Sequence, residues 1–352
     1  MSAILIATLI CFLVPAYVYI GYPLVLWVLS SLKSLQEVAM PPVDKLPTVT
    51  LVVSCFNEAD VIEEKLNNVM ELDYPEDRLS VLVVSDGSTD GTDEIVERFA
   101  AQGVQLIRQE GRLGKTMGLN LAMESVRSDI TVFSDANAMY APDAVRQLVR
   151  HFQRPDVGYV VGAALYTDGE VGASAQNEGL YWRYELAIKT MESRLYRGVF
   201  EPKAQCFEET AGEFDKEIAR KERIVNRSIR GLFRVRGVMN PFKTGLFSFM
   251  VISHKLLRWL IPLFLALGGF GSLALSLFGV TVFKLIALGG VLTIGLAAIG
   301  HFSSHKNALP IWISFPYYFV AVNWYAVRGI LRAIQGETQV TWDSARPGRE
   351  GR

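Results

Sequence analysis

Two apolar segments of the chain each end in an acidic cluster. The first is Val81–Gly91 (VLVVSDGSTDG) and the second is Ile130–Ala138 (ITVFSDANA). Such runs of β-branched and aromatic residues are typical of buried parallel strands, and ligands bind beyond the carboxyl ends of these strands. Asp86 and Asp135 would therefore lie on one edge of a sheet. Oxygen ligands suit Mg²⁺ or Mn²⁺, so these residues predict a site for a metal-bound nucleotide.

Further polar residues stand near the same strand ends. Asn57 and Glu58 follow an earlier apolar strand, and Asn137 comes two residues after Asp135. Between the acidic clusters lies Arg108–Lys115 (RQEGRLGK), where basic residues beside glycine could approach a phosphate or a base. Taken alone, the first acidic cluster is equally well a turn that caps a helix, and the basic stretch a plain surface loop.

Strands alternate with helices through the middle of the chain. The patterns predict strands over 48–55, 79–85, 104–107, 130–134 and 157–164, and helices over 59–72, 92–102, 114–126 and 142–152. This alternation predicts an α/β fold with an open, mostly parallel sheet. The polar strand ends would then share one edge.

Apolar segments flank this α/β region. No Asp, Glu, Lys or Arg precedes Lys33, and Ala3–Leu32 is long enough to span a bilayer. The absence of a basic n-region favours a transmembrane helix over a signal peptide. Near the other end, Trp259–Phe283 and Leu285–His305 predict two more spans, joined by a turn near Lys284.

A last apolar run, 307–327, leads into Arg328 and Arg332 and could be a fourth span or an interfacial helix. The distribution of Lys and Arg puts the N-terminus outside and the middle domain in the cytosol of the inner (plasma) membrane. An interfacial last helix keeps the Arg-rich tail cytosolic as well, and we favour it. The expected organisation is a transmembrane helix over 1–32, a cytosolic domain over 45–240, interfacial and transmembrane helices over 241–334, and a cytosolic tail over 335–352.

Composition supports a membrane protein and excludes other classes. The 352 residues are 50% hydrophobic and 20% charged, with a mean hydropathy of +0.24. A formal net charge of -1 does not favour nucleic acid as a partner. The three cysteines have neither disulfide-framework nor zinc spacing, which suits a reducing cytosol.

Four segments together resemble family 2 glycosyltransferases of the GT-A fold, especially the membrane-embedded synthases of cellulose, chitin, hyaluronan and poly-N-acetylglucosamine. The matching segments, in the family's order and spacing, are 55–58 (CFNE), 86–90 (DGSTD), 114–120 (GKTMGLN) and 135–137 (DAN). The resemblance implies a GT-A, Rossmann-like, mostly parallel sheet in a cytosolic domain, with transmembrane helices at both ends. It also implies inverting, metal-dependent transfer of a sugar from a UDP-sugar donor to a growing polysaccharide.

The resemblance assigns roles residue by residue. Asn57, Glu58 and Asp86 would hold the uridine and ribose, and Lys115 would lie by the base or the diphosphate. Asp135 would bind Mg²⁺ or Mn²⁺ through the UDP phosphates. Asn137 stands where the family usually has a second aspartate, and an amide adds no charge, so the affinity for the cation would be lower.

The family's Gln-x-x-Arg-Trp motif has a partial counterpart in the segment 220–224 (RKERI). The resemblance makes Arg223 and Arg220 the candidate catalytic residues, although only Arg223 matches the motif. The non-catalytic alternative is that 213–234 is a basic amphipathic helix that lies on anionic lipid headgroups, and the two interpretations are compatible. The tail residues Trp342 and Arg346 are similar to the cytosolic gating segment of these synthases.

An inverting transfer needs a general base for the acceptor hydroxyl. The family's base lies in a segment that would fall between Leu195 and Tyr196, where this chain has none. No other carboxylate clearly replaces the base. The pair Glu208-Glu209 follows the next strand, but the family has acidic residues there as well as its base, and Asp168 and Glu178 belong to no motif and are typical of solvated surface charges. This gap weakens the case for activity more than the case for the fold.

Three hypotheses therefore stay open. The first is a polysaccharide synthase, with accessory export subunits as further partners. The second is a transferase that moves a single sugar to a polyprenyl phosphate. The third is a non-catalytic UDP-sugar-binding membrane protein that partners an intact synthase.

Overall fold

The computed structural model describes residues 1–33, 38–166, 173–208, 214–303 and 309–337, without the side chains of 166 and of 173–181 and 214–220. Packing divides the chain into two compact units. The helical unit is made of Met1–Ser34, Gly169–Tyr196 and Glu213–Thr338, and the α/β unit of Leu35–Asp168, Arg197–Gly212 and Gln339–Arg352.

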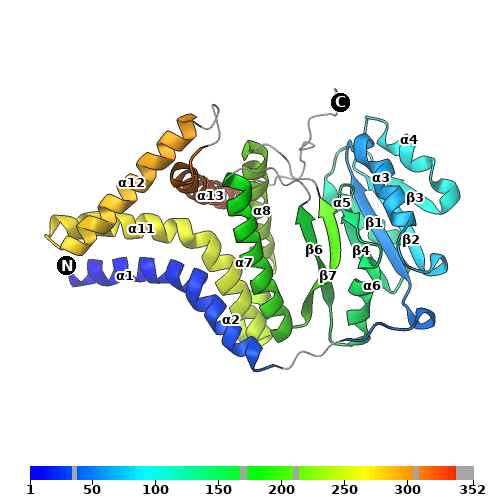
Figure 1. Ribbon diagram of the computed structural model, residues 1–352, viewed down its shortest axis with the longest axis horizontal. Helices are drawn as coiled ribbons and strands as arrows, with labels where there is room; N and C mark the ends of the chain where they lie inside the picture. Colours follow the sequence, from blue (N-terminus) through cyan, green and yellow to red (C-terminus); the bar gives the residue numbers. More distant parts are fainter. Residues whose placement is uncertain (34–37, 167–172, 209–213, 304–308, 338–352) are drawn as a thin grey trace. The chain divides into compact units, whose positions relative to one another are not determined.

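A four-stranded parallel sheet forms the centre of the α/β unit (Figure 1). Its order is β3-β2-β1-β4, with β1 at Val49–Cys55, β2 at Leu79–Ser85, β3 at Val104–Arg108 and β4 at Ile130–Asp135. All seven residues of β1 are buried, as expected of a central parallel strand. Cys55 is paired with Ser85 and Ser54 with Asp135, so the acidic clusters end on one edge as predicted.

Helices cover both faces of this sheet. On one face, Leu51 and Val53 of β1 belong to the core that includes Ile62 of α3 (Ala59–Met70), together with residues of α4 (Thr92–Glu97) and α6 (Ala144–Val149). On the other face, Val52 packs with Ala122 of α5 (Lys115–Ser125). The alternation of side chains along β1 thus gives both faces an apolar cover.

A second, three-stranded sheet has the order β5-β7-β6. It contains β5 (Met139–Tyr140), β6 (Tyr159–Tyr166) and β7 (Gly198–Glu208). β6 and β7 run parallel, whereas β5 and β7 run antiparallel. The sequence predicted β6 but not that it belongs to a separate sheet. Through β7, the segment that follows Leu195 comes to lie beside the strand that follows Asp135.

Three helices of the described chain are long and apolar enough to cross a membrane: Ser2–Ser31, Leu246–Leu277 and Thr281–Ser303. The first two are each interrupted by a π-helical turn, at Tyr17–Gly21 and Val251–Leu256, which separates α1 (Ser2–Ala16) from α2 (Tyr22–Ser31) and α10 (Leu246–Met250) from α11 (Leu257–Leu277). The third span is α12 (Thr281–Ser303).

The turn between the last two spans was predicted at the wrong place. It falls at 278–280, not near Lys284, which lies inside α12. Gly279 has a φ of +85° in this turn, a left-handed conformation that ends a helix at little cost for glycine. Gly279 therefore indicated the position of the turn better than the charge of Lys284 did.

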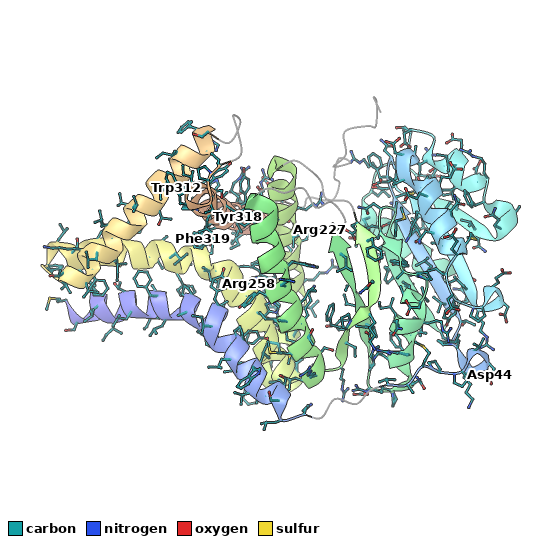
Figure 2. All side chains as sticks on the ribbon, viewed as in Figure 1. Asp44, Arg227, Arg258, Trp312, Tyr318 and Phe319 are labelled. Atoms are coloured by element: carbon teal, nitrogen blue, oxygen red, sulfur yellow. The ribbon has the colours of Figure 1, made fainter. Side chains whose placement is uncertain are left out.

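The remaining long helices of the helical unit are α7 (Ala173–Leu195), α8 (Phe214–Arg234) and α13 (Ile311–Ile334). α13 packs on α8, where the Lys221 Nζ atom donates to the Tyr318 hydroxyl at 2.7 Å, and Tyr318 is labelled in Figure 2. α13 is not one of the three candidate spans, so its interfacial placement stays a prediction. Short elements complete the description: α9 (Pro241–Thr244) and 3-10 turns at Val43–Lys45, Glu76–Arg78, Ala100–Gln102, Arg150–Gln153 and Arg236–Met239.

By packing, α7 and α8 belong to the helical unit, although the sequence assigned them to the cytosolic domain. A buried polar cluster helps to explain this grouping for α7. His254 contacts Glu192 of α7 at 2.8 Å and Glu185 of α7 at 3.3 Å, and Arg258 donates to Glu185 at 2.7 Å. Figure 2 labels Arg258 beside α7. The linear domain boundaries themselves stay a prediction.

Candidate functional site

Asp86 organises the loop that follows β3. Its side chain is 3% exposed, and its Oδ1 atom accepts hydrogen bonds from the Gln109 Nε2 atom at 2.7 Å and the backbone N–H groups of Leu113 at 2.9 Å and Gly114 at 2.8 Å. A buried carboxylate needs such donors. The predicted binding residue therefore fixes the loop 109–114 at the same edge of the sheet.

Asn57 joins the turns that follow β1 and β2. It has a φ of +51°, a conformation in which asparagine is enriched. Its N–H group donates to the Ser88 hydroxyl at 3.1 Å, and its Oδ1 atom accepts from the Thr89 N–H group at 2.9 Å. The neighbouring residue, Glu58, is the N-cap of α3, and its N–H group donates to Thr92 Oγ1 at 2.9 Å.

Asp90 has the capping role that the sequence left open. Its carboxylate accepts from the N–H group of Ala59, the first residue of α3, at 3.0 Å, and from that of Thr92 at 3.1 Å. Partial burial raises the pKa of Asp90, but the hydrogen bonds from Thr92 and Ala59 outweigh it and hold that pKa below its ordinary value. Asp86 and Asp90 thus have separate tasks, one on each side of the same turn.

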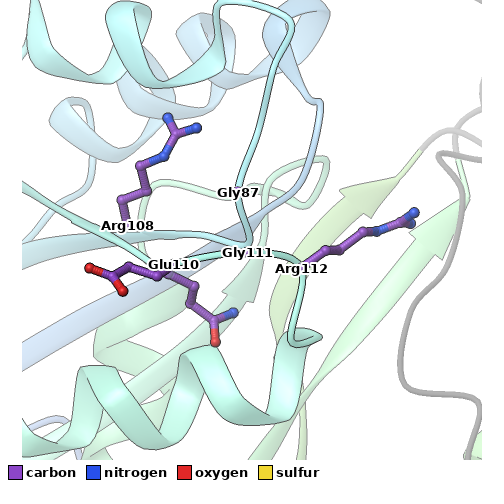
Figure 3. Close-up of a pocket in the computed structure, with 6 residues that line it drawn as sticks. Gly87, Arg108, Glu110, Gly111 and Arg112 are labelled. Atoms are coloured by element: carbon purple, nitrogen blue, oxygen red, sulfur yellow. The ribbon is translucent and has the colours of Figure 1, made fainter.

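A pocket of about 410 Å³ opens beside Asp86 (Figure 3). Its size falls in the usual range of small-ligand sites. It is lined by Gly87, Arg108, Gln109, Glu110, Gly111 and Arg112.

Two glycines allow the two loops that line this pocket to lie in close contact. Gly87 has a φ of +76°, and a Cβ atom there would lie 3.1 Å from the Gly111 carbonyl oxygen. Figure 3 shows Arg108 and Arg112 leaving the loop in different directions. Arg108 forms an ion pair with Asp93, and the Arg112 guanidinium lies 3.9 Å from the centre of the Phe56 ring. The loop is therefore anchored on both sides.

Lys115 and Asp135 are brought together. Lys115 is the first residue of α5 and forms an ion pair with the carboxylate at the end of β4. The Asp135 side chain is 51% exposed, so it is accessible to a ligand. Gly114, with a φ of +91°, precedes the helix and lets the chain turn at this point. A helix N-terminus with a cation at its start suits a phosphate group.

The donor set at Asp135 fits a divalent cation that arrives with phosphate. The described residues contain no group of three or more His, Cys, Asp or Glu side chains that could hold a metal alone. Asp135 and the partly exposed Asn137 would supply at most two protein ligands. Mg²⁺ keeps several waters and takes phosphate oxygens, so two protein ligands are sufficient.

Two residues of α3 that the sequence analysis missed support the Asp135 turn. Lys65 is fully buried, donates to the Ala138 carbonyl oxygen and lies 3.8 Å from the centre of the Tyr140 ring. Burial lowers the pKa of Lys65 to about 8. Asn68 exchanges hydrogen bonds of 2.9 and 2.8 Å with the backbone of Tyr140. A lysine on the apolar face of a predicted helix was the signal that could have found this support.

The residues predicted for the acceptor side belong to different units, Arg223 to the helical unit and Glu208 to the α/β unit. Arg223 lies on α8 in the helical unit, whereas the donor residues belong to the α/β unit, and its catalytic role stays a prediction. The Arg220 side chain lies outside the described residues, as do those of Glu178 and the whole of Asp168, Glu209, Trp342 and Arg346.

Comparison with known sequences finds a family match in the middle of the chain. The family model described as glycosyl transferase family 2 matches residues 50–206. The poly-beta-1,6-N-acetyl-D-glucosamine synthase of Staphylococcus aureus (strain MSSA476) is 31% identical over 123 residues, which cover 34% of this chain and 29% of the synthase. The synthase of the same name from Staphylococcus epidermidis is 27% identical over 116 residues, covering 32% and 28%. The matches thus span less than a third of either relative.

Comparison with solved structures extends over nearly the whole chain. The mannosyltransferase PcManGT from Pyrobaculum calidifontis, solved in complex with GDP-Man and Mn²⁺, superposes with a TM-score of 0.62. The superposition covers 94% of this chain and 99% of that one at 23% sequence identity. The predicted fold, a mostly parallel α/β sheet with apolar helices at both ends, is confirmed.

Proposed function

Because its residues 50–206 show that the chain belongs to glycosyltransferase family 2, we propose that it transfers a hexose from a UDP-sugar to a growing polysaccharide at a membrane. One observation carries the proposal. The loop fixed by Asp86 and the pair of Lys115 and Asp135 lie on the same edge of one parallel sheet.

The uridine end of the donor is assigned to the pocket beside Asp86. A Cβ atom at Gly111 would meet nothing within 4 Å, which leaves room for a planar base near the backbone of this loop. Asn57 and Glu58 border the same edge and would contact the ribose. Because Asp86 holds the loop 109–114, its first task is to shape this pocket.

The diphosphate is assigned to the start of α5. Lys115 would exchange Asp135 for a phosphate oxygen, and the first N–H groups of α5 would add to that attraction. Asp135 and Asn137 would hold Mg²⁺ or Mn²⁺, which neutralises the diphosphate and makes UDP a better leaving group. The Mn²⁺ of the Pyrobaculum mannosyltransferase supports this choice of cation.

Transfer then proceeds by inversion at the anomeric carbon. The acceptor hydroxyl gives its proton to a general base and its oxygen forms a bond to C1, the bond from C1 to the diphosphate oxygen breaks, and UDP departs with the electron pair. The similarity to poly-GlcNAc synthases supports a polysaccharide acceptor. The three apolar helices support a site at a membrane, which we assign to the cytosolic face of the plasma membrane, with export subunits as candidate partners.

The test uses the full chain in lipid nanodiscs. UDP-GlcNAc, UDP-glucose and GDP-mannose are supplied with Mn²⁺, Mg²⁺ or EDTA, and nucleotide binding and release are measured. We expect UDP binding that depends on the cation and is lost in Asp135→Ala but kept in Asp156→Ala, an exposed aspartate that pairs with Arg154. Unchanged affinity in Asp135→Ala would reject the site. A chain-length assay separates polymerisation from single transfer, and binding without release supports the non-catalytic alternative.

A further inference from the structure

The end of β7 lies against the turn that carries Asp135. β5 follows directly from that turn and pairs antiparallel with β7, with Met139 opposite Phe207 and Tyr140 opposite Cys206. One further step in this register places Glu208 opposite Ala138. Ala138 has only a methyl group, and on its other edge β7 pairs with β6, where Glu208 lies opposite Tyr166.

Glu208 shares a face with the groups that surround Asp135. Side chains opposite each other in an antiparallel pair lie on one face, and residues two apart on a strand do the same. Tyr140, Cys206 and Glu208 are therefore on one face of this sheet, the face where the Lys65 ammonium group contacts Tyr140.

The electrostatics agree with this placement. Burial raises the pKa of Cys206 to about 11, and the charges of Glu208 and Asp135 raise it while Lys65 lowers it. The same two carboxylates also act on Lys65 itself. Asp135 from β4 and Glu208 from β7 thus approach one cluster from two strands.

We propose that Glu208 is the general base for the acceptor hydroxyl, in place of the carboxylate whose segment is missing between Leu195 and Tyr196. The proposal rests on the proposed function. Asp135 would serve the diphosphate and Glu208 the acceptor, so each carboxylate has one task.

The step balances without any further reactant. The acceptor O–H proton passes to a Glu208 carboxylate oxygen as the acceptor oxygen bonds to C1. The bond between C1 and the diphosphate oxygen breaks, and UDP takes the electron pair. Glu208 then returns its proton to water.

The experiment compares Glu208→Gln with the wild-type full chain in nanodiscs. Glutamine keeps the size of the side chain but cannot accept the proton. We expect UDP release from the preferred donor to fall about 100- to 10,000-fold, with UDP affinity in Mn²⁺ within twofold of wild type. Glu208→Asp should keep part of the rate. Glu97→Gln, an exposed glutamate of α4, serves as the matched control and should keep all of it.

A second variant separates catalysis from structure. In Glu208→Ala, added formate should restore part of the UDP release, because a small carboxylate replaces the lost base. Unchanged release in Glu208→Gln would overturn the proposal, as would a loss of UDP affinity equal to the loss of rate.

The wild-type chain separates this proposal from the proposed function. UDP binding without any release from the donors supplied would overturn the role of Glu208 and leave the donor site standing. Absence of UDP binding would reject the donor site itself.

Discussion

Lys115, at the first turn of α5, forms an ion pair with Asp135, at the end of β4. These are the groups that the proposed function assigns to the diphosphate and to the cation. An ammonium group and a divalent cation compete for one carboxylate, so arrival of the metal-bound donor must release the lysine. The released lysine is then placed to bind phosphate.

Lys115→Met should therefore change two affinities in opposite directions. Without nucleotide, Mn²⁺ should bind more tightly, because Asp135 no longer has a competing cation. With Mn²⁺ present, UDP should bind about 10- to 150-fold more weakly, since a charged hydrogen bond contributes about 1.5–3 kcal/mol. Titration calorimetry measures both, with Lys45→Met, an exposed lysine, as the control. If the affinities for Mn²⁺ and for UDP change in the same direction, Lys115 does not exchange Asp135 for a phosphate.

Gly118→Ala should damage the nucleotide pocket from a distance. A Cβ atom at Gly118 would lie 2.9 Å from Gln109 Nε2 and 2.9 Å from Val84 Cγ1. The added methyl group would displace the amide that donates to Asp86. We expect UDP affinity to fall about tenfold, the effect of roughly one hydrogen bond to a charged group.

The matched control for Gly118→Ala is Gly231→Ala. Gly231 lies within α8, and a Cβ atom there would meet nothing within 4 Å. Replacing an open helical glycine by alanine stabilises a helix by about 1 kcal/mol. Thermal unfolding should show a higher midpoint for Gly231→Ala and a lower one for Gly118→Ala, and a higher midpoint in both would show that Gln109 can move aside.

Local sequence patterns predicted the strands that carry the site residues. They did not predict the long-range hydrogen bonds that hold those residues in place. The limits of β2 were predicted to the residue because a buried β-branched run ends at a polar turn. The hydrogen bond from Gln109 to Asp86 spans 23 positions, and that from Lys65 to Ala138 spans 73. No periodic pattern encodes partners at such separations.

The same limit applies to the capping turn. The sequence offered the first acidic cluster as a turn that caps the following helix, and within that cluster Asp90 does accept from Thr92 of the helix. It also accepts from Ala59 of α3, which precedes it by 31 positions. That second contact exists because β1 and β2 are neighbours in the sheet, which depends on tertiary structure.

Glu201 should make the free energy of unfolding of the α/β unit depend on pH in the acidic range. Burial raises the pKa of this carboxyl, but hydrogen bonds from His151, the Lys203 N–H group and Arg150 outweigh it and lower the pKa to about 2. Because this lies below the unfolded value near 4.5, the stabilisation is complete above about pH 4.5 and is lost as the pH falls towards 2. The shift corresponds to about 3 kcal/mol for a side chain that is 4% exposed.

Glu201→Gln measures this contribution. Its thermal midpoint should lie well below that of the wild type at pH 7, and the difference should shrink as the pH falls below 4.5. The exposed Glu76→Gln serves as the control and should match the wild type throughout. If the difference in thermal midpoint stays constant with pH, packing of the Glu201 side chain, not its charge, accounts for the stabilisation.

His254 should be essential for the stability of the helical unit. It is 3% exposed and lies between Glu185 and Glu192, and Glu192 also accepts from the Tyr22 hydroxyl. His254→Leu removes a hydrogen-bond partner of two carboxylates at once. Leaving a buried polar group without its partner costs about 1–3 kcal/mol, and more for a charged group, so the thermal midpoint in detergent should fall sharply. His301→Leu, at an exposed histidine of α12, should change it little.

A second substitution tests whether the unpaired charge is the cause. Glu185 keeps its bond from Arg258 when His254 is removed, whereas Glu192 keeps a bond from the Tyr22 hydroxyl and gains no cation. Neutralising Glu192 should therefore recover much of the loss, and His254→Leu with Glu192→Gln should melt above His254→Leu alone. If the double variant melts at or below the single one, lost packing rather than an orphaned carboxylate explains the defect, because glutamine at 192 removes the charge and leaves the volume unchanged.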